Sequence, residues 1–188
     1  MAQLSREAID KMGFAAVGAD VMISDRASFY NCKNISIGNN TRVDDFCVLA
    51  AGVGGIFIGD FVHLAVGVTL IGAGRITLCD YSGLSSRVSV YSSSDDYTGG
   101  AMTNPTIPAE YTAVESADVF FAKHVIVGSG TVILPGVTLE EGVAVGALSL
   151  VNRSCLEFGV YAGNPARRVK ERKRDFLALE KKLVAARG

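Results

Sequence analysis

Residues 121–151 read FAKHVIVGSGTVILPGVTLEEGVAVGALSLV, and in them a large apolar residue returns at every sixth position without a break. A period of six fits neither the 3.6-residue turn of a helix nor the two-residue alternation of a long strand. It predicts a chain that runs two or three extended residues, turns, and repeats. Small residues follow many of the large ones four places later, as Val125, Val137 and Ser149 do. The large residues are Phe121, Val127, Ile133, Leu139, Val145 and Val151.

The same hexads run backward from Val90 to Val17, with extra residues at 39–40 and 52–55 that we interpret as corner insertions. Three hexads make a triangular coil of about 18 residues, with the large and the small positions pointing inward. One coil has no buried interior, so several must stack to form a continuous core. The repeat therefore predicts an all-β solenoid, a parallel β-helix of about six coils. A β-sandwich of alternating strands is the alternative, and the unbroken hexads of 121–151 argue against it.

The two ends of the chain break the repeat and favour helices. Residues 1–14 contain Ser5 as a candidate N-cap and Gly13 as a stop, which predicts a short N-terminal helix. Residues 163–188 carry apolar residues near helical spacing among many Lys and Arg residues, which predicts an amphipathic C-terminal helix. Both helices would cover the open ends of the solenoid. We expect the 188 residues to form one domain, with the β-helix over 15–156.

The composition argues against several classes of partner. The net charge of −1 gives no electrostatic reason to expect binding to nucleic acid. No apolar run reaches the ~18 residues of a membrane span, and the first residues lack the apolar segment of a secretory signal, so we expect a cytoplasmic protein without a membrane span. The four cysteines lack the spacing of a metal site, which predicts free thiols and no metal. They are Cys32, Cys47, Cys79 and Cys155.

One polar stretch interrupts the repeat. Residues 90–105, VYSSSDDYTGGAMTNP, place Asp95 beside Asp96, and the hexads resume only at Phe121. We expect a loop over 91–118 that leaves the solenoid. A long polar loop with two adjacent carboxylates indicates a functional site, since binding and catalytic residues concentrate on loops held by a rigid scaffold.

The hexad pattern resembles the hexapeptide-repeat acyltransferases, and so does the C-terminal stretch with GNPA at 163–166. The resemblance implies a left-handed parallel β-helix, a homotrimer, acetyl-CoA as the acyl donor, and active sites between neighbouring prisms. Residues 92–108, SSSDDYTGGAMTNPTIP, are similar to the branch that acetylates sugars or nucleotide sugars for lipopolysaccharide, O-antigen or capsule. In such relatives the long loop walls the acceptor pocket.

The resemblance places the catalytic base where that loop begins, and many relatives carry a histidine there. Here the position falls at or beside Asp95, and no histidine occurs between residues 64 and 123. Asp95 is therefore the first candidate for proton acceptor or substrate anchor. If Asp96 points the same way, its like charge favours protonation of one of the two carboxylates, although neighbours in the sequence can also point apart. A neutral amine attacks a thioester unaided, whereas a hydroxyl needs a base during the attack. The missing histidine thus favours an amino sugar, although a sugar hydroxyl stays open.

His63, in GDFVHLAVG (59–67), is the rival base. It ends its hexad and should face outward, and an imidazole exchanges protons near neutral pH. Some amino-sugar acetyltransferases of this fold carry a histidine in a similar setting. The alternative interpretation is a surface or interface histidine. His124 lies in a coil that most relatives share, where their residues vary, so we place it outside the chemistry.

The donor site needs a groove of small residues for the pantetheine arm and cations for the CoA phosphates. Gly128 and Ser129 recur one coil later as Gly146 and Ala147, which predicts that groove, although the same residues also turn corners. Asn164 is expected at the end of the groove. The phosphate contacts are assigned to Arg168, Lys170 and Arg172, and the acceptor contacts to Tyr91, Ser94, Tyr97 and Asn104.

Two other functions are alternatives. A γ-type carbonic anhydrase uses the same scaffold but needs three histidines that converge on zinc, and this chain has two. A non-catalytic β-helix scaffold is the other, and the long polar loop argues against it. Acetyl-CoA discriminates these functions, since a bound donor stabilises an acyltransferase against heat and does not stabilise a scaffold.

Overall fold

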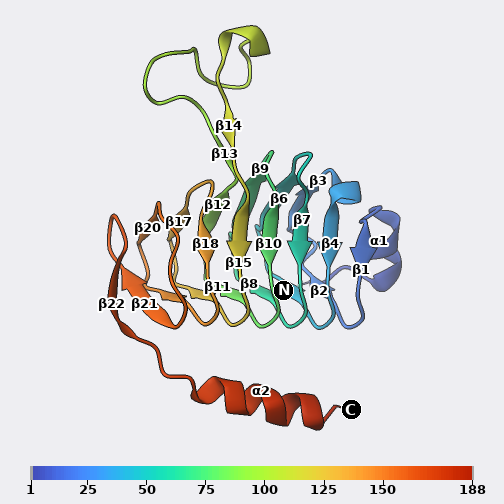
Figure 1. Ribbon diagram of the computed structural model, residues 1–188. Coiled ribbons are helices and arrows are strands. Elements are labelled where there is room, and N and C mark those ends of the chain that lie inside the picture. The colour runs from blue at the N-terminus through green and yellow to red at the C-terminus, as the bar shows by residue number, and fades with distance from the viewer. Residues whose placement is uncertain (1, 188) are drawn as a thin grey trace.

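The computed structural model describes residues 2–187, and over this range the chain forms a three-sided prism of parallel β-strands (Figure 1). Residues 1 and 188, the outer limits of the two expected helices, lie outside this range. Strands pair in parallel with the strands one coil before and one coil after them. Three strands and three corners therefore make one coil, as the hexads predicted.

Each side of the prism is one sheet. The first sheet contains β1 (Ala16–Val17), β4 (Ile35–Ile37), β7 (Ile56–Ile58), β10 (Ile76–Leu78), β15 (Val119–Phe121) and β18 (Thr138–Leu139). The second contains β2 (Met22–Ile23), β5 (Arg42–Val43), β8 (His63–Leu64), β11 (Gly83–Leu84), β16 (Ile126–Val127), β19 (Ala144–Val145), β21 (Gly159–Ala162) and β22 (Arg167–Glu171). The third contains β3 (Ser28–Tyr30), β6 (Val48–Ala51), β9 (Thr69–Gly72), β12 (Ser89–Tyr91), β17 (Val132–Ile133) and β20 (Leu150–Val151).

The prism has six full coils, and β21 begins a seventh, so the expected all-β solenoid of about six coils is confirmed. The strand registers place hexad positions over one another, since Leu64 pairs with Leu84 and Leu84 pairs with Val127. These three side chains are at most 1% exposed. The large residues of the hexads thus form a buried column, and the removal of this apolar surface from water stabilises the stack.

One corner of the prism places its backbone in the left-handed region. Phe61, Tyr81 and His124 occupy this corner in successive coils, with φ values of 56°, 61° and 61°. Gly142 takes the same corner in the next coil with φ of 66°, and a Cβ there would lie 2.5 Å from the ring of Phe158. Only glycine fits at position 142, because any side chain would clash with that ring.

The short helix α1 (Arg6–Lys11) lies at the N-terminal end of the prism. Ser5 caps it, as predicted, since its hydroxyl accepts a hydrogen bond from the Ala8 amide at 3.2 Å. Ile9 of this helix is 2% exposed and belongs to the core. The helix therefore adds an apolar side chain to the buried column where the stack of coils begins.

The helix expected over 163–188 is wrong in its first part. β22 pairs with β21 as an antiparallel hairpin, and α2 (Asp175–Ala185) begins only after that hairpin. Without β22, the strand that ends the second sheet would leave its edge unpaired. The hydrogen bonds of this hairpin outweigh the helical spacing of the apolar residues.

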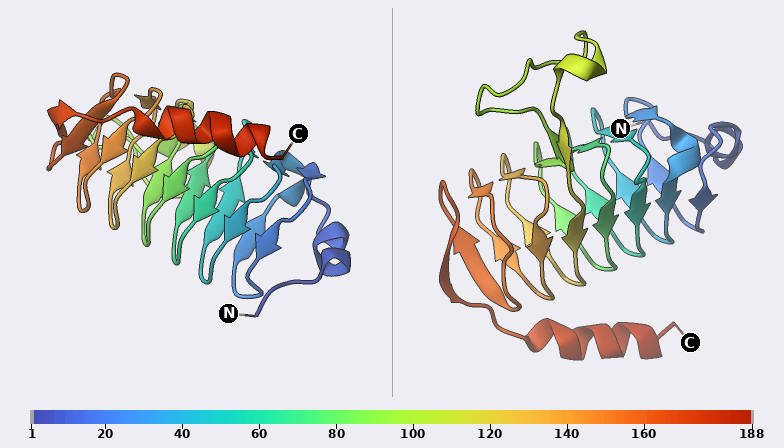
Figure 2. Two further views of the ribbon diagram at one scale, coloured as in Figure 1. Left: turned by 90° about the horizontal axis from the view of Figure 1, so that it is seen from below. Right: turned by 45° about the horizontal axis from the view of Figure 1, so that its top comes forward.

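The helix α2 runs back along the outside of the prism (Figure 2). Its Phe176 lies on His124 with ring centroids 4.8 Å apart. Near its end, the guanidinium carbon of Arg187 lies 4.6 Å from the ring centroid of Phe61. α2 therefore packs along the aromatic corner and does not cover the open end of the solenoid.

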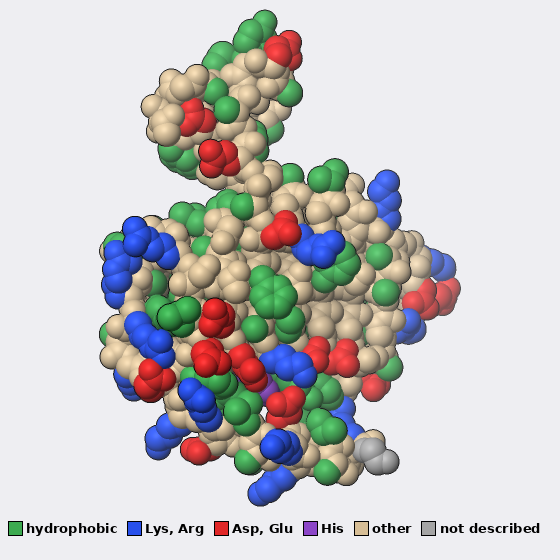
Figure 3. Space-filling view, in the orientation of Figure 1, with side chains coloured by type: hydrophobic (Ala, Val, Ile, Leu, Met, Phe, Trp, Pro, Cys, Tyr) green, Lys and Arg blue, Asp and Glu red, His purple; other side chains and the backbone are tan. Residues whose placement is uncertain are grey.

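The predicted interruption is an excursion from the third sheet. β13 (Ser93–Ser94) and β14 (Glu115–Ser116) pair antiparallel and form its stem. The 3₁₀ turn η2 (Ala109–Tyr111) belongs to the excursion, whereas η1 (Cys32–Asn34) lies between β3 and β4. Figure 1 and Figure 3 show the excursion standing clear of the prism. It leaves after β12 and returns at β15, close to the expected bounds of 91–118.

Two features of residues 2–187 bear on function. Over this range no helix is long and apolar enough to cross a membrane. The same residues hold no group of three or more His, Cys, Asp or Glu side chains that could bind a metal ion. The four cysteines carry free thiols. Burial raises the pKa of Cys47 and of Cys155 to about 11, so both thiols stay protonated at neutral pH.

Candidate active site

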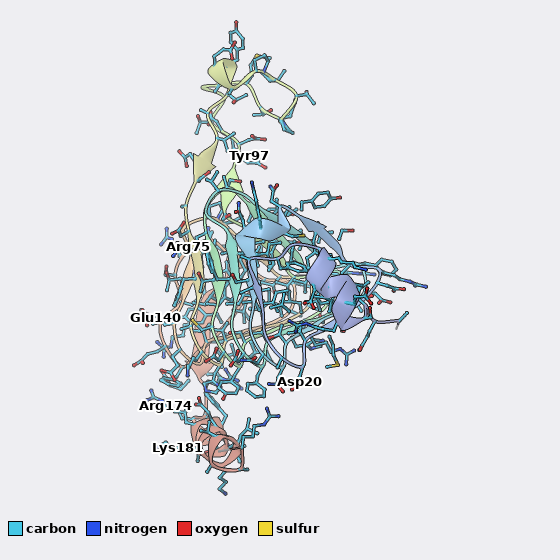
Figure 4. All side chains as sticks on the ribbon, turned by 90° about the vertical axis from the view of Figure 1, so that its right-hand side faces the viewer. Asp20, Arg75, Tyr97, Glu140, Arg174 and Lys181 are labelled. Carbon is cyan, nitrogen blue, oxygen red and sulfur yellow. The ribbon has the colours of Figure 1, made fainter. Side chains whose placement is uncertain are left out.

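The root of the excursion holds a cavity of about 690 Å³. Its walls come from the end of β12, from the beginning of the excursion, and from the next coil at Val132, Leu134 and Pro135. Figure 4 labels Tyr97 at this root, between the prism and the far end of the excursion. The cavity brings together four residues that the sequence assigned to the site: Tyr91, Ser94, Asp95 and Tyr97.

A second cavity, of about 550 Å³, shares Ser93, Ser94 and Asp95 with the first. Asn104, which the sequence assigned to the acceptor, lines this second cavity. The backbone N–H of Asn104 donates a hydrogen bond to Oδ2 of Asp95 at 3.4 Å. Asp95 therefore lines both cavities. Most of the remaining lining of the second cavity is apolar: Ile71, Pro105, Ile107, Ala109 and Val114.

The neighbouring carboxylate, Asp96, has a different role. Its Oδ1 accepts a hydrogen bond from the Thr98 amide at 2.7 Å, and its Oδ2 accepts one from the Ala101 amide at 2.9 Å. The hydrogen bonds from Thr98 lower the pKa of Asp96, with further bonds from Ala101 and Gly100. Both carboxylate oxygens of Asp96 thus have backbone partners, and its role as a catalytic carboxylate coupled to Asp95 stays a prediction. Asp96 shapes the turn that follows the cavity.

The outer face of the second sheet carries a separate groove of about 290 Å³. His63 lies in β8 and points outward, as predicted, with its side chain 50% exposed. Ser129, assigned to the donor, lines the same groove. The groove thus brings one candidate base and one donor residue together. Its full lining is His63, Ala65, Gly83, Leu84, Ser85, Ser86, Ile126 and Ser129.

Ser85 and Ser86 were missed by the sequence analysis. Position 85 follows Leu84 just as Ala65 follows Leu64, so the hexad register alone places it on the groove. A hydroxyl at that position, where the next coil has Gly128, was the signal that could have found it. Ser85 adds a hydroxyl, which can donate a hydrogen bond, to a groove that also contains the small residues Ala65 and Gly83.

An ion cluster around a buried carboxylate, Asp44, lies beside the groove. Nε2 of His63 is 2.9 Å from Oδ2 of Asp44, and Nε of Arg42 is 2.6 Å from Oδ1 of the same carboxylate. The Asp44 side chain is only 7% exposed. Burial raises the pKa of Asp44, but the hydrogen bonds and charges of His63 and Arg42 outweigh burial and hold that pKa below its usual value. Asp44 is therefore ionised at neutral pH.

The groove and the cavity of Asp95 do not meet within one protomer. The groove belongs to the second sheet and to the corner that follows it, whereas the cavity belongs to the third sheet and the excursion. Among residues 2–187, none lines both. The structure thus keeps His63 and Asp95 in separate hollows of the same chain.

The glycines of the expected donor groove also have a structural role. A Cβ on Gly128 would lie 2.5 Å from the backbone nitrogen of Ala147, so a side chain there would separate two coils. Gly146 lies one coil beyond Gly128, and a Cβ there would meet Ala162 at 3.2 Å. Close stacking therefore explains these glycines, and the lining of the His63 groove includes neither of them.

The basic residues near the end of the chain divide into two groups. Arg172 donates hydrogen bonds to the carbonyl oxygens of His124 and Gly142 at 2.7 and 3.0 Å, and burial lowers the pKa of its guanidinium. Arg172 thus ties the segment before α2 to the prism, and its contact with CoA phosphates stays a prediction. Arg168 and Lys170 are exposed on β22, and Asn164 is exposed in the turn before it.

Comparison with known proteins identifies the family. The chain is 53% identical over 180 residues to a dTDP-4-amino-4,6-dideoxy-D-glucose acyltransferase of Escherichia coli, and the match covers 96% of this chain and 94% of that relative. The chain belongs to the hexapeptide-repeat acyltransferase family. A putative lipopolysaccharide biosynthesis O-acetyl transferase, WbbJ of Escherichia coli K12, is 29% identical over 85% of this chain and 88% of its own length. No protein-family model matches the chain.

Solved structures agree with this assignment. An Asp-to-Asn variant of AntD, an N-acyltransferase from Bacillus cereus, matches with a TM-score of 0.95 and 41% identity over 99% of this chain and 100% of AntD, and it holds dTDP and coenzyme A. A Ser-to-Ala variant of AntD, at 0.94 and 42% over 98% of both chains, holds dTDP-4-amino-4,6-dideoxyglucose and coenzyme A. The acyltransferase is thus a left-handed parallel β-helix, as the sequence resemblance implied.

Proposed function

We propose that this acyltransferase moves an acyl group from acyl-CoA to the amino group of a dTDP-linked 4-amino-4,6-dideoxyhexose. The position of Asp95, which lines two cavities at the root of the excursion, carries the proposal. The 53% identity to an acyltransferase named for that amino sugar supports it. Acetyl is the acyl group expected from the sequence. The alternative is 3-hydroxybutyryl, since AntD has been crystallised with 3-hydroxybutyryl-CoA.

The proposed reaction forms an amide. The sugar nitrogen attacks the thioester carbon, the carbon–sulfur bond breaks, and CoA leaves as a thiolate that finally takes up the proton lost by the nitrogen. Asp95 would accept a hydrogen bond from the amino group and so aim the nitrogen lone pair at the thioester. Tyr91, Ser94 and Tyr97 would hold the rest of the acceptor in the larger cavity.

The proposal includes a homotrimer whose active sites lie between protomers. Acyl transfer needs the donor and the acceptor in contact, and the His63 groove does not meet the Asp95 cavity within one chain. A neighbouring prism can bring its groove to the excursion of the first. Apolar side chains that are 38–45% exposed on the outside of the prism would pack in such an assembly: Phe57, Val66, Phe120 and Ile126.

A cytoplasmic location and a role in surface polysaccharide synthesis complete the proposal. The four free thiols fit a reducing compartment. The similarity to WbbJ, named for lipopolysaccharide biosynthesis, supports the pathway class. Sugar O-acetylation is the second candidate on the same ground.

The test is an acyl-transfer assay with dTDP-4-amino-4,6-dideoxyglucose and either acetyl-CoA or 3-hydroxybutyryl-CoA. We expect one CoA thiol to be released for each acceptor that gains one acyl mass. The matched control acceptor is dTDP-6-deoxyglucose, which carries a hydroxyl in place of the amine. Preference for the hydroxyl compound would turn the assignment to O-acylation, and no transfer between any of these pairs would overturn the proposal.

A further inference from the structure

Asp44 is an acid at a position where the following coils carry small residues. It comes directly after the hexad residue Val43, and the matching positions of the next three coils hold Ala65, Ser85 and Gly128. A carboxylate that is almost fully buried is costly unless charged or polar groups pair with it. Ala65 and Ser85 line the His63 groove, so the groups that pair with Asp44 bear on that groove.

The contact with Asp44 fixes the protonation pattern of the His63 ring. The carboxylate is ionised, because the hydrogen bonds from His63 and Arg42 outweigh burial and lower its pKa. An ionised carboxylate accepts hydrogen bonds and donates none. In the 2.9 Å contact with Asp44 the hydrogen must therefore be on Nε2 of His63.

The other ring nitrogen is left as the basic one. A neutral imidazole with hydrogen on Nε2 has its lone pair on Nδ1. Within residues 2–187, Nδ1 of His63 has no hydrogen-bond partner. The ring is half exposed and lines the groove together with Ser85 and Ser129. One end of the ring is thus held by the protein, and the basic nitrogen is available to a ligand in the groove.

We infer that Asp44 is a positioning residue that makes His63 the proton acceptor of acyl transfer. This inference rests on the proposed function. As the sugar nitrogen bonds to the thioester carbon, its proton passes to Nδ1 of His63, and the Asp44 carboxylate stabilises the resulting imidazolium. The carbon–sulfur bond then breaks, and the departing thiolate takes the proton from Nδ1. One amide and one CoA thiol result, and the ring returns to its starting form.

This division of roles leaves Asp95 with the acceptor. Asp95 holds the amino group from the excursion, and His63 receives the proton from the groove that a neighbouring prism supplies. The competing explanation is that Arg42, Asp44 and His63 form an ion cluster that only stabilises the second sheet. The two explanations differ in what happens to the rate and to its pH dependence.

The test compares kcat and its pH profile for His63→Gln and Asp44→Asn. We expect His63→Gln to lower kcat by about 10²-fold or more, as for a lost general base. We expect Asp44→Asn to lower kcat by about 10-fold or more and to move the acid limb of the profile to lower pH, because the imidazolium loses its carboxylate. The KM for acyl-CoA should change little in either variant.

The matched control is Glu180→Gln, which removes the carboxylate partner of the other histidine. Oε2 of Glu180 lies 2.8 Å from Nε2 of His124, away from the groove. We expect kcat and the pH profile to stay as in the wild type. Nitrogen-15 NMR of the His63 ring adds a readout that needs no turnover, and it should find the neutral ring protonated on Nε2.

The outcomes distinguish a failure of this inference from a failure of the proposed function. Wild-type transfer together with unchanged kcat and pH profile in Asp44→Asn, even with a lower melting temperature, would overturn the inference alone. A neutral His63 ring protonated on Nδ1 would do the same. Failure of the wild type to acylate the amino sugar would overturn the proposed function and the proton step with it.

Discussion

The ring of His124 stacks on the ring of Tyr81, with centroids 5.0 Å apart and planes 8° from parallel. Tyr81 stacks in turn on Phe61 at 5.2 Å, and Phe176 of α2 contacts His124 at 4.8 Å. Aromatic contacts of this kind stabilise by ~0.5–1.5 kcal/mol each beyond the area they bury. α2 therefore packs on the prism through this column of rings.

Phe176→Ala should loosen α2 without affecting the chemistry. The change removes the contact with His124 and the cation–π contact with Arg172, whose guanidinium carbon lies 4.6 Å from the ring centroid. We expect the free energy of unfolding to fall by roughly 1–3 kcal/mol, since the side chain is only partly buried. Thermal unfolding measures it, with Leu179→Ala, at a residue 61% exposed, as the control. Equal losses in the two variants would contradict the packing described.

Asp95→Asn should separate binding of the donor from turnover. The amide keeps the shape of the side chain but loses the charge that orients the amino group, so we expect kcat/KM to fall by ~10²-fold or more with acyl-CoA affinity unchanged. Asp96→Asn is the comparison, because Asp96 bonds to the backbone of its own turn. We expect that variant to lose less activity. A larger loss in Asp96→Asn would reverse the roles assigned to the two carboxylates.

Val145→Asp should abolish folding. Val145 is 4% exposed and pairs with Val127 in the buried column, so the substitution places an unpaired charge inside the stack. Ala144→Asp changes the preceding residue, which alternation turns outward. We expect Ala144→Asp to give folded protein by circular dichroism and Val145→Asp to give none. Normal yield of folded Val145→Asp would mean that the inward register is wrong by one position.

The stability that Asp44 contributes should disappear in acid. Its pKa is lower in the folded chain than the usual value of about 3.9. Such a group stabilises the fold above the unfolded-state pKa, and the contribution is lost as the pH falls through the folded-state pKa. The difference in melting temperature between the wild type and Asp44→Asn should therefore persist at pH 5 and narrow as the pH falls below about 4. A difference that widens toward lower pH would contradict the pairing with His63 and Arg42.

The sequence predicted the prism because a six-residue period fixes the inward positions and, once coils stack, the register. The N-cap at Ser5 and the excursion were also predictable, because each is marked by residues close together in the sequence. The C-terminal hairpin was not predictable from the spacing of apolar residues. β22 pairs with the free edge of β21, and that edge exists only once the coils have assembled. The backbone contacts of Arg172 were not predictable for a related reason, since nothing in the sequence tells which way a basic side chain points.

The candidate site was only partly predictable. Tyr91, Ser94, Asp95 and Tyr97 follow one another in the chain, and the cavity at the root of the excursion gathers all four. The contact between Asp44 and His63 joins neighbouring coils across the insertion at 52–55, so its register depends on how that corner is built. The separation of the groove from the cavity is a property of the folded prism and has no local signal.

The coil before the excursion pairs directly with the coil after it. Leu78 pairs with Phe121, and Val90 with Ile133, in the same registers that join uninterrupted coils. The excursion can therefore lengthen, shorten or change its side chains during evolution without altering the strand pairing of the coils. Such an arrangement would let proteins that share this scaffold evolve to accept different sugars through changes in this one segment.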